Sequence, residues 1–162
     1  MEIEGEHRFE TEREAVWTAL FEPATLRLAL PAIESLERID EDAFELVAFI
    51  EIRGFWGRFR GLARVTHVNE PDSYHLRLSG AAAEGTAMGQ GTVTLSEDGE
   101  STLLRYRGDL TVHGALTRLG GRFVGGSIRM LIRQFLEGLA RELTPEVSEP
   151  PGTSRSDEPP PP

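Results

Sequence analysis

The sequence predicts an α+β protein in which a curved antiparallel sheet of about seven strands wraps around a long C-terminal helix, with two short helices after the first strand. Two observations support this class. From Leu36 onward, successive runs alternate apolar and polar residues and are separated by turn signals. Residues 115–143 then lack proline and space their apolar residues as a helix does. A chain of 162 residues fits one such domain.

The first strand and the two short helices are expected within residues 3–31. Odd positions of 3–10 carry the strand's inward side, because the even positions are all charged. Thr11 with Glu14 predicts a capping box that starts the first helix. Pro23 suits the first turn of the second helix, and Pro31 ends it. The buried side of the first helix is expected to carry Val16, Trp17 and Leu20.

Five turn signals, at 40–42, 54–57, 69–72, 80–85 and 97–100, predict a meander of six further strands. Alternation places one set of residues on a common inner face: Phe44, Leu46, Ala48, Ile50, Ile52, Phe59, Gly61, Ala63, Val65, Tyr74, Leu76, Leu78, Ala87, Gly89, Gly91, Val93, Leu104, Tyr106, Gly108 and Leu110. Several of these are glycine or alanine. Small inward residues leave room for a cavity, and glycines also mark bends that curl a sheet; both interpretations can hold together.

Residues 115–143 predict a single helix of about 40 Å. Its glycines, Gly120, Gly121, Gly125 and Gly126, each weaken a helix interior by about 1 kcal/mol relative to alanine. We therefore expect a close approach to the sheet, a ligand or another chain to offset them. Residues 144–162 are rich in proline, serine and acid, which predicts a disordered tail after a ligand-binding domain of residues 1–143.

Composition limits the possible functions. The chain has no cysteine, which excludes disulfides and thiolate chemistry, and its net charge of -10 disfavours nucleic-acid binding. The first residues are charged and lack the apolar core of a secretory signal, and no stretch is long and apolar enough to span a membrane. We expect a cytoplasmic protein whose membrane contact, if it has any, is peripheral at the inner face.

Short sequence features resemble the carbon monoxide dehydrogenase G-subunit family of the helix-grip (START-like, SRPBCC) superfamily. They are Glu4-Gly5-Glu6, Arg13, Val16-Trp17, Leu20, Pro23, Leu26, Pro31, Glu34-Ser35-Leu36, Phe59-Arg60-Gly61 and Gly89-Gln90-Gly91. The Pro-Gly-Cys often seen after the second helix is here Pro31-Ala32-Ile33. The resemblance implies an accessory protein of molybdenum-containing CO dehydrogenase-like enzymes, which recruits the enzyme to the membrane and handles its quinone.

An internal cavity would be bounded by the sheet and the long helix. The residues we expect to bind the ligand are Leu26, Leu30, Ile50, Phe59, Leu76, Tyr106, Leu119, Phe123, Leu131 and His7. His7 and Tyr106 are polar groups on the inner face, which suits contact with a quinone carbonyl or a role as acid and base. Alternatively, they are satisfied core or rim residues. Alternation places His67 inward and His75 outward, so we expect no metal site.

Two surface features suit contact with a membrane or a partner. Phe55 and Trp56 lie at a hairpin tip, where they either dock on another surface or fold back over the cavity mouth. On the long helix, four arginines fall within one narrow arc, which is either a solvated face or a site for anionic headgroups or an acidic partner. These are Arg118, Arg122, Arg129 and Arg133.

These observations predict a non-catalytic carrier or adaptor with no covalent cofactor. Its ligand would be an isoprenoid quinone or a similar lipid, and its partner a molybdenum hydroxylase-type enzyme, as the resemblance implies. Two alternatives remain. One is a small-molecule cyclase or dehydratase that uses His7 and Tyr106 on the same fold. The other is a pure interaction module whose cavity is filled by side chains.

Overall fold

The computed structural model describes residues 1–52 and 55–144, with the backbone alone for residues 52, 55 and 56. The predicted side-chain roles of Ile52, Phe55 and Trp56, and the predicted disorder of 145–162, lie outside the described residues.

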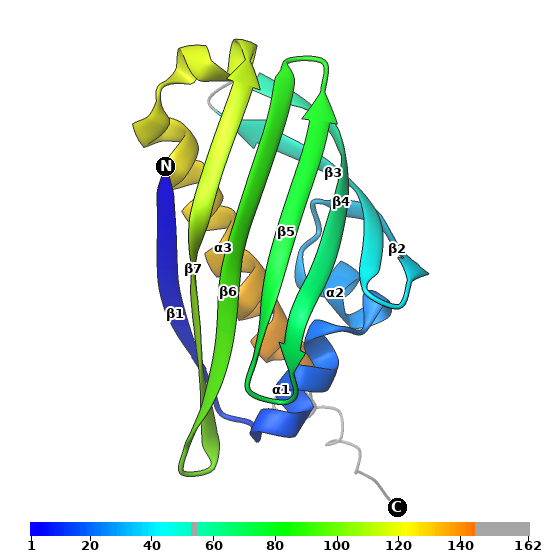
Figure 1. Ribbon diagram of the computed structural model, residues 1–162, viewed down its shortest axis with the longest axis vertical. Helices are drawn as coiled ribbons and strands as arrows, with labels where there is room; N and C mark the ends of the chain where they lie inside the picture. Colours follow the sequence, from blue (N-terminus) through cyan, green and yellow to red (C-terminus); the bar gives the residue numbers. More distant parts are fainter. Residues whose placement is uncertain (53–54, 145–162) are drawn as a thin grey trace, which may run out of the picture.

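The described residues form one seven-stranded antiparallel sheet in the order β1-β7-β6-β5-β4-β3-β2, with α3 lying across its concave face (Figure 1). The predicted fold class is confirmed. The elements are β1 Glu2–Phe9, α1 Arg13–Leu20, α2 Pro23–Ala29, β2 Ile33–Asp40, β3 Ala43–Ile52, β4 Phe55–Asn69, β5 Ser73–Ala82, β6 Gly85–Asp98, β7 Ser101–Gly114, the 3₁₀ helix η1 Ala115–Leu119, and α3 Gly121–Leu143.

The predicted inner face of the sheet is confirmed by the strand register. Leu76 pairs with Gly91, Gly91 with Gly108, and Gly108 with Ile3 of β1, so these residues form one row across four strands. Alternation then places their even-spaced neighbours on the same side. The outward-pointing Arg58, Arg60 and Arg64 of β4 are exposed, as alternation requires.

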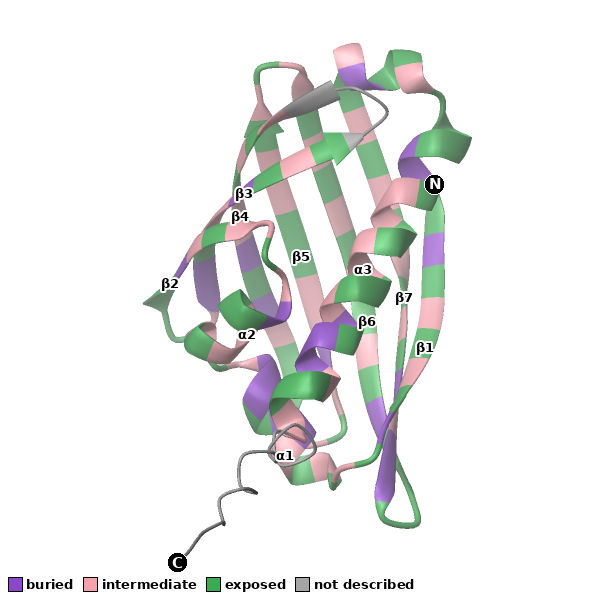
Figure 2. Cartoon of the chain, turned by 180° about the vertical axis from the view of Figure 1, so that it is seen from behind, coloured by how far each residue is buried: buried purple, intermediate pink, exposed green. Residues whose placement is uncertain are grey.

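The core is packed most tightly at the end of the sheet near α1. Figure 2 shows buried residues gathering there, while half-buried and exposed residues alternate along the middle of the sheet and much of α3. The cluster centres on Phe9, Val16 and Leu139, each of which is almost fully buried. Trp17 and Leu20 join it from α1, as predicted. One end of the fold is thus solid, which leaves the middle free to hold a cavity.

The predicted capping box at Thr11 and Glu14 is wrong. The residue before α1 is Glu12, it makes no side-chain capping bond, and the helix begins at Arg13. Thr11 is instead used in the connection from β1, where its backbone carbonyl accepts a 2.7 Å hydrogen bond from the Thr102 hydroxyl. This tertiary contact fixes the position of Thr11 one residue outside the helix, so its side chain cannot reach the first-turn amides.

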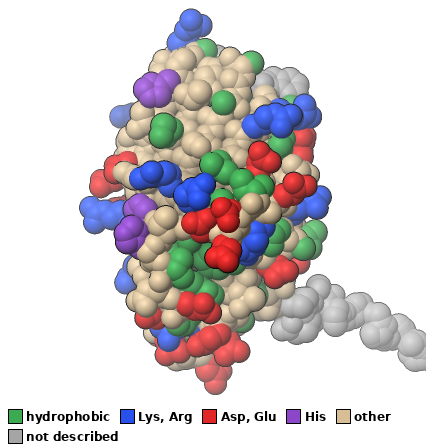
Figure 3. All heavy atoms as spheres, turned by 45° about the vertical axis from the view of Figure 1, so that its right-hand side comes forward, with side chains coloured by type: hydrophobic (Ala, Val, Ile, Leu, Met, Phe, Trp, Pro, Cys, Tyr) green, Lys and Arg blue, Asp and Glu red, His purple; other side chains and the backbone are tan. Residues whose placement is uncertain are grey.

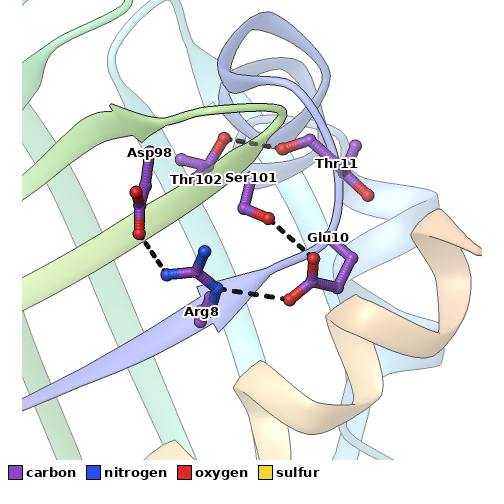
Figure 4. Close-up of polar contacts among 6 residues, drawn as sticks. All are labelled: Arg8, Glu10, Thr11, Asp98, Ser101 and Thr102. Carbon is purple, nitrogen blue, oxygen red and sulfur yellow. Dashed lines mark hydrogen bonds and ion pairs between the residues drawn. The ribbon is translucent and has the colours of Figure 1, made fainter.

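The start of β7 holds the β1–α1 connection through side chains. Ser101 and Thr102 point from β7 toward Glu10 and Thr11, and Arg8 pairs with both Glu10 and Asp98 (Figure 4). Thr102 is fully buried.

Replacing Thr102 by valine keeps the shape of the side chain but leaves the partly buried Thr11 carbonyl without its donor. We expect the free energy of unfolding to fall by about 1–2 kcal/mol, as measured by urea denaturation. Thr86, which is exposed on β6, provides the matched control. Thr86→Val should change stability little, and an equal loss in both variants would contradict the role given to the Thr102 hydroxyl.

The predicted single helix of residues 115–143 is interrupted. Residues 115–119 form the 3₁₀ helix η1, and Gly120 separates it from α3 with a φ of 86°. That value lies in the left-handed region, which residues other than glycine adopt only with strain. Gly120 therefore ends one helix and starts the next. α3 itself has 23 residues and spans about 35 Å.

α3 is held against α2 by a close backbone approach. A Cβ atom built on Gly138 would lie 2.7 Å from the carbonyl carbon of Ala29, inside van der Waals contact, so only glycine fits there. Gly138 and Ala29 are both buried. Of the predicted glycines, Gly125 is packed against Met1, whereas a Cβ atom on Gly126 would meet open space.

Candidate ligand cavity

An apolar cavity of about 300 Å³ lies between the concave face of the sheet and α3. Side chains from β1, α1, β5, β6, β7 and α3 form its wall. The inward-facing residues among them are Ile3, Leu20, Tyr74, Leu76, Leu78, Val93, Leu104, Tyr106, Leu110, Ile128, Ile132, Phe135 and Leu136, with Gly89, Gly91 and Gly108 in the floor. A volume of this size matches the lower end of small-molecule sites.

The glycines of the floor both allow the sheet to curl and leave room for the cavity, the two interpretations that the sequence left open. A Cβ atom on Gly91 would come within 2.9 Å of the Gly108 Cα on the neighbouring strand, so these glycines let β6 and β7 approach closely where the sheet curls. They also present no side chain to the cavity that they line. Leu76 and Ile3 flank them on either side, so the floor is apolar.

Of the residues predicted to bind the ligand, Leu76 and Tyr106 lie together in this wall. The others lie outside the lining. Leu26 packs against the small cluster of Leu36, Phe44 and Ala63. Phe123 is 45% exposed. The half-buried residues outside the lining are His7, Leu30, Ile50, Phe59, Leu119 and Leu131.

The prediction missed the side of α3 that faces the cavity. Ile128, Ile132 and Leu136 follow one another at intervals of four, and this spacing was a readable signal of a continuous helical face. The cavity lies toward β5, β6 and β7, so it takes this side of α3 rather than the side with Leu131 and Phe123. Leu20 of α1 closes the cavity near the solid end of the fold.

The prediction that alternation separates His67 and His75 on opposite faces of the sheet is wrong. Their ring centroids are 5.9 Å apart. A β-bulge interrupts the pairing of β4 with β5 between Thr66 and Asn69, and His67 has a φ of 51°, so the alternation fails there. Within the described part of the chain, no group of three or more histidine, aspartate or glutamate side chains is placed to hold a metal ion.

Three polar residues border or line the inner face. Burial raises the pKa of the Tyr74 hydroxyl, which lies deep in the core. Burial also raises the pKa of Tyr106, although the positive charges of Arg129 and Arg133 oppose this. Burial lowers the pKa of His7 below its usual 6.5, and the nearby Glu137 carboxylate partly offsets this. His7 is therefore neutral at pH 7, and both tyrosines keep their protons.

The four arginines do not form one stripe. Arg118 lies in η1, on the other side of the Gly120 break from α3, so a continuous helical wheel does not relate it to the rest. Arg129 donates a hydrogen bond to the Glu2 carbonyl oxygen of β1. Arg129 and Arg133 lie near Tyr106. All four are exposed.

Charge is mixed on the convex side of the sheet. Figure 3 shows acidic and basic side chains interspersed on this face, in keeping with ion pairs such as Arg58–Glu34 and Arg64–Asp42. Such exposed pairs add little stability. Among the described residues, no helix combines the length and apolar character needed to cross a membrane.

A curled antiparallel sheet that holds a long helix over an apolar cavity defines a ligand-binding protein of the helix-grip class. The chain resembles a START superfamily protein from Mycobacterium smegmatis, with 14% identity and a TM-score of 0.69 over 90% of this chain and 98% of that one. It resembles the Zhui aromatase/cyclase from a Streptomyces species, with 12% identity and a TM-score of 0.70 over 91% and 95%. These similarities concern the fold.

A conserved protein from Geobacillus kaustophilus is more similar, with 26% identity and a TM-score of 0.84 over 90% of this chain and 97% of that one. The comparison with curated proteins returned no match. The family model for the G-subunit of carbon monoxide dehydrogenase (CoxG) matches residues 5–144. The chain belongs to this family.

Proposed function

We propose that this protein is a non-catalytic carrier that holds an isoprenoid quinone or a similar lipid in its cavity. The observation that carries the proposal is the apolar wall around about 300 Å³ between the sheet and α3. Each buried methylene contributes about 0.8 kcal/mol, so ten of them contribute about 8 kcal/mol before the entropy of association is subtracted. Micromolar affinity, which corresponds to about 8 kcal/mol, is thus within reach of hydrophobic burial supplemented by a few polar contacts.

The proposed partner is a molybdenum-containing CO dehydrogenase-like enzyme, to which the carrier would be accessory. Membership of a family described as a subunit of carbon monoxide dehydrogenase supports this proposal. Peripheral contact with the inner face of the membrane would give the carrier access to lipid. The exposed guanidinium groups of Arg118 and Arg122 suit anionic headgroups, although the chain as a whole carries a net charge of -10.

The test is mass spectrometry of organic extracts from the protein purified without detergent. We expect a quinone or another lipid in near-stoichiometric amount. A protein of similar negative charge, purified in the same way from the same cells, is the control for lipid that co-purifies without a site. Protein stripped of lipid should regain it on incubation with a quinone.

A clean extract that stays clean after incubation with a quinone would contradict the carrier function. That result would favour an interaction module, in which the surface of the domain, and not its cavity, is the functional site.

A further inference from the structure

The apolar cavity is bordered by polar groups where β1 and α3 meet, and one of them, Tyr106, belongs to its lining. Tyr106 of β7 lies opposite Gly5 of β1, and a Cβ atom on Gly5 would collide with the Tyr106 hydroxyl. The ring therefore extends over Gly5, toward the outer edge of the sheet. Gly5 is required here because any side chain would displace the phenol.

Two arginines of α3 lie near this phenol. Arg129 and Arg133 are one helical turn apart, and both are close enough to Tyr106 for their charges to act on its hydroxyl. The hydrogen bond from Arg129 to the Glu2 carbonyl oxygen, at 3.3 Å, holds that guanidinium against β1. We call Tyr106, which lines the cavity, together with Arg129 and Arg133, which are exposed just outside its lining, the donor edge.

The donor edge has unused hydrogen-bonding capacity. Among the described residues, the Tyr106 hydroxyl has no hydrogen-bond partner, and Arg133 makes neither a hydrogen bond nor an ion pair. A guanidinium only donates, and the phenol beside two cations is best used as a donor too. The rest of the inward wall is apolar apart from Tyr74, which is buried in the core. The donor edge is therefore where the polar end of a ligand can reach hydrogen-bond donors without entering the core.

We propose that the donor edge binds the polar end of the ligand and selects one that accepts hydrogen bonds, namely a quinone carbonyl or a carboxylate. The Tyr106 hydroxyl donates to the acceptor oxygen, and Arg129 and Arg133 supply positive charge beside it. The apolar chain then lies along Leu76 and Ile132 inside the cavity. This inference rests on the proposed carrier function, because it concerns the occupant of the same cavity.

The test compares ligands that share one chain but differ at the polar end. Dodecanoate and 1-dodecanol are titrated calorimetrically into lipid-free protein, and a quinone with a decyl chain is titrated alongside. We expect the wild-type protein to bind dodecanoate at least about tenfold more tightly than 1-dodecanol, because hydrogen bonds to charged groups are the stronger ones. The quinone is expected to bind as well, which would show that a neutral carbonyl suffices.

Tyr106→Phe keeps the ring over Gly5 and removes only the donor. We expect it to weaken dodecanoate and the quinone by about tenfold and 1-dodecanol by less. Arg133→Gln should weaken dodecanoate more than the quinone, which carries no charge. Arg141→Gln, an exposed arginine in the last turn of the same helix, is the matched control and should bind all three ligands as the wild-type protein does. Unchanged thermal unfolding confirms that each variant is folded.

The outcomes separate the two proposals. Equal binding of acid and alcohol by the wild-type protein, or equal weakening of both by Tyr106→Phe, would overturn the donor edge while the carrier function stands. If lipid-free wild-type protein binds none of the three ligands, both proposals are wrong.

Discussion

Gly138→Ala is expected to lower the free energy of unfolding by about 3 kcal/mol. The added methyl group would overlap the backbone carbonyl of Ala29, at the point where α2 lies against α3. A flexible side chain could move aside at little cost, but here the neighbour is a helix backbone, so α2 must shift as a unit. Ala29 and Leu139 are almost fully buried, and this shift would open the solid end of the core. Chemical denaturation of Gly138→Ala measures the loss.

Gly126→Ala is the matched control, on the same helix with the opposite expectation. A Cβ atom at Gly126 meets open space, so the substitution removes only glycine's conformational entropy in a helix interior. We expect it to raise the free energy of unfolding by about 0.5–1 kcal/mol. If both alanines are tolerated equally, α2 and α3 do not approach as described.

Ile132→Trp is expected to weaken ligand binding by about 100-fold in a protein that still folds. Ile132 lines the cavity from α3, and a larger side chain there would occupy space that the ligand's chain needs. Excluding three or four methylenes removes about 3 kcal/mol of burial, which weakens binding by about 100-fold. Because the new ring enters existing space, the stability should be retained. Calorimetric titration with a decyl-chain quinone measures the affinity, and chemical denaturation measures the stability.

Gln134→Trp provides the control for this substitution. Gln134 is exposed on the same helix, so the same ring would point to solvent and leave the cavity unchanged. Normal loading is expected. If Ile132→Trp also loads normally, the ligand does not occupy this cavity, and the site must be sought elsewhere on the fold.

Alternation was sufficient to predict most of the sheet, because each inward residue is constrained by its neighbours on both sides. It failed at His67, where a bulge adds a residue and reverses the alternation. That stretch has no glycine to mark the bulge, and it is His67 that adopts the positive φ, which is uncommon for residues other than glycine even though histidine adopts it more often than most. The convergence of His67 with His75 was therefore not predictable from the strand pattern.

The helical half of the cavity was harder to predict. Apolar residues occupy more than one side of the last helix, so their spacing alone does not show which side faces the sheet. Phe123 was therefore predicted to bind the ligand, although it is 45% exposed. The side with Ile132 was settled by tertiary contacts, including the approach of Gly138 to α2. Thr11 shows the same effect at smaller scale, because a hydrogen bond from distant Thr102 outweighed a local capping pattern.

The pairing of β1 with β7 has a consequence for how the chain folds. Ile3 lies opposite Gly108, so the first strand can pair only after the last strand has been synthesised. The other neighbouring strands follow one another directly in the sequence, so they can pair soon after they are synthesised. Contacts this distant in sequence carry a large loop-closure entropy and slow the search for the native state. Until residues 101–114 have left the ribosome, β1 is an unpaired strand with an apolar side, and closing the sheet is a late step of folding.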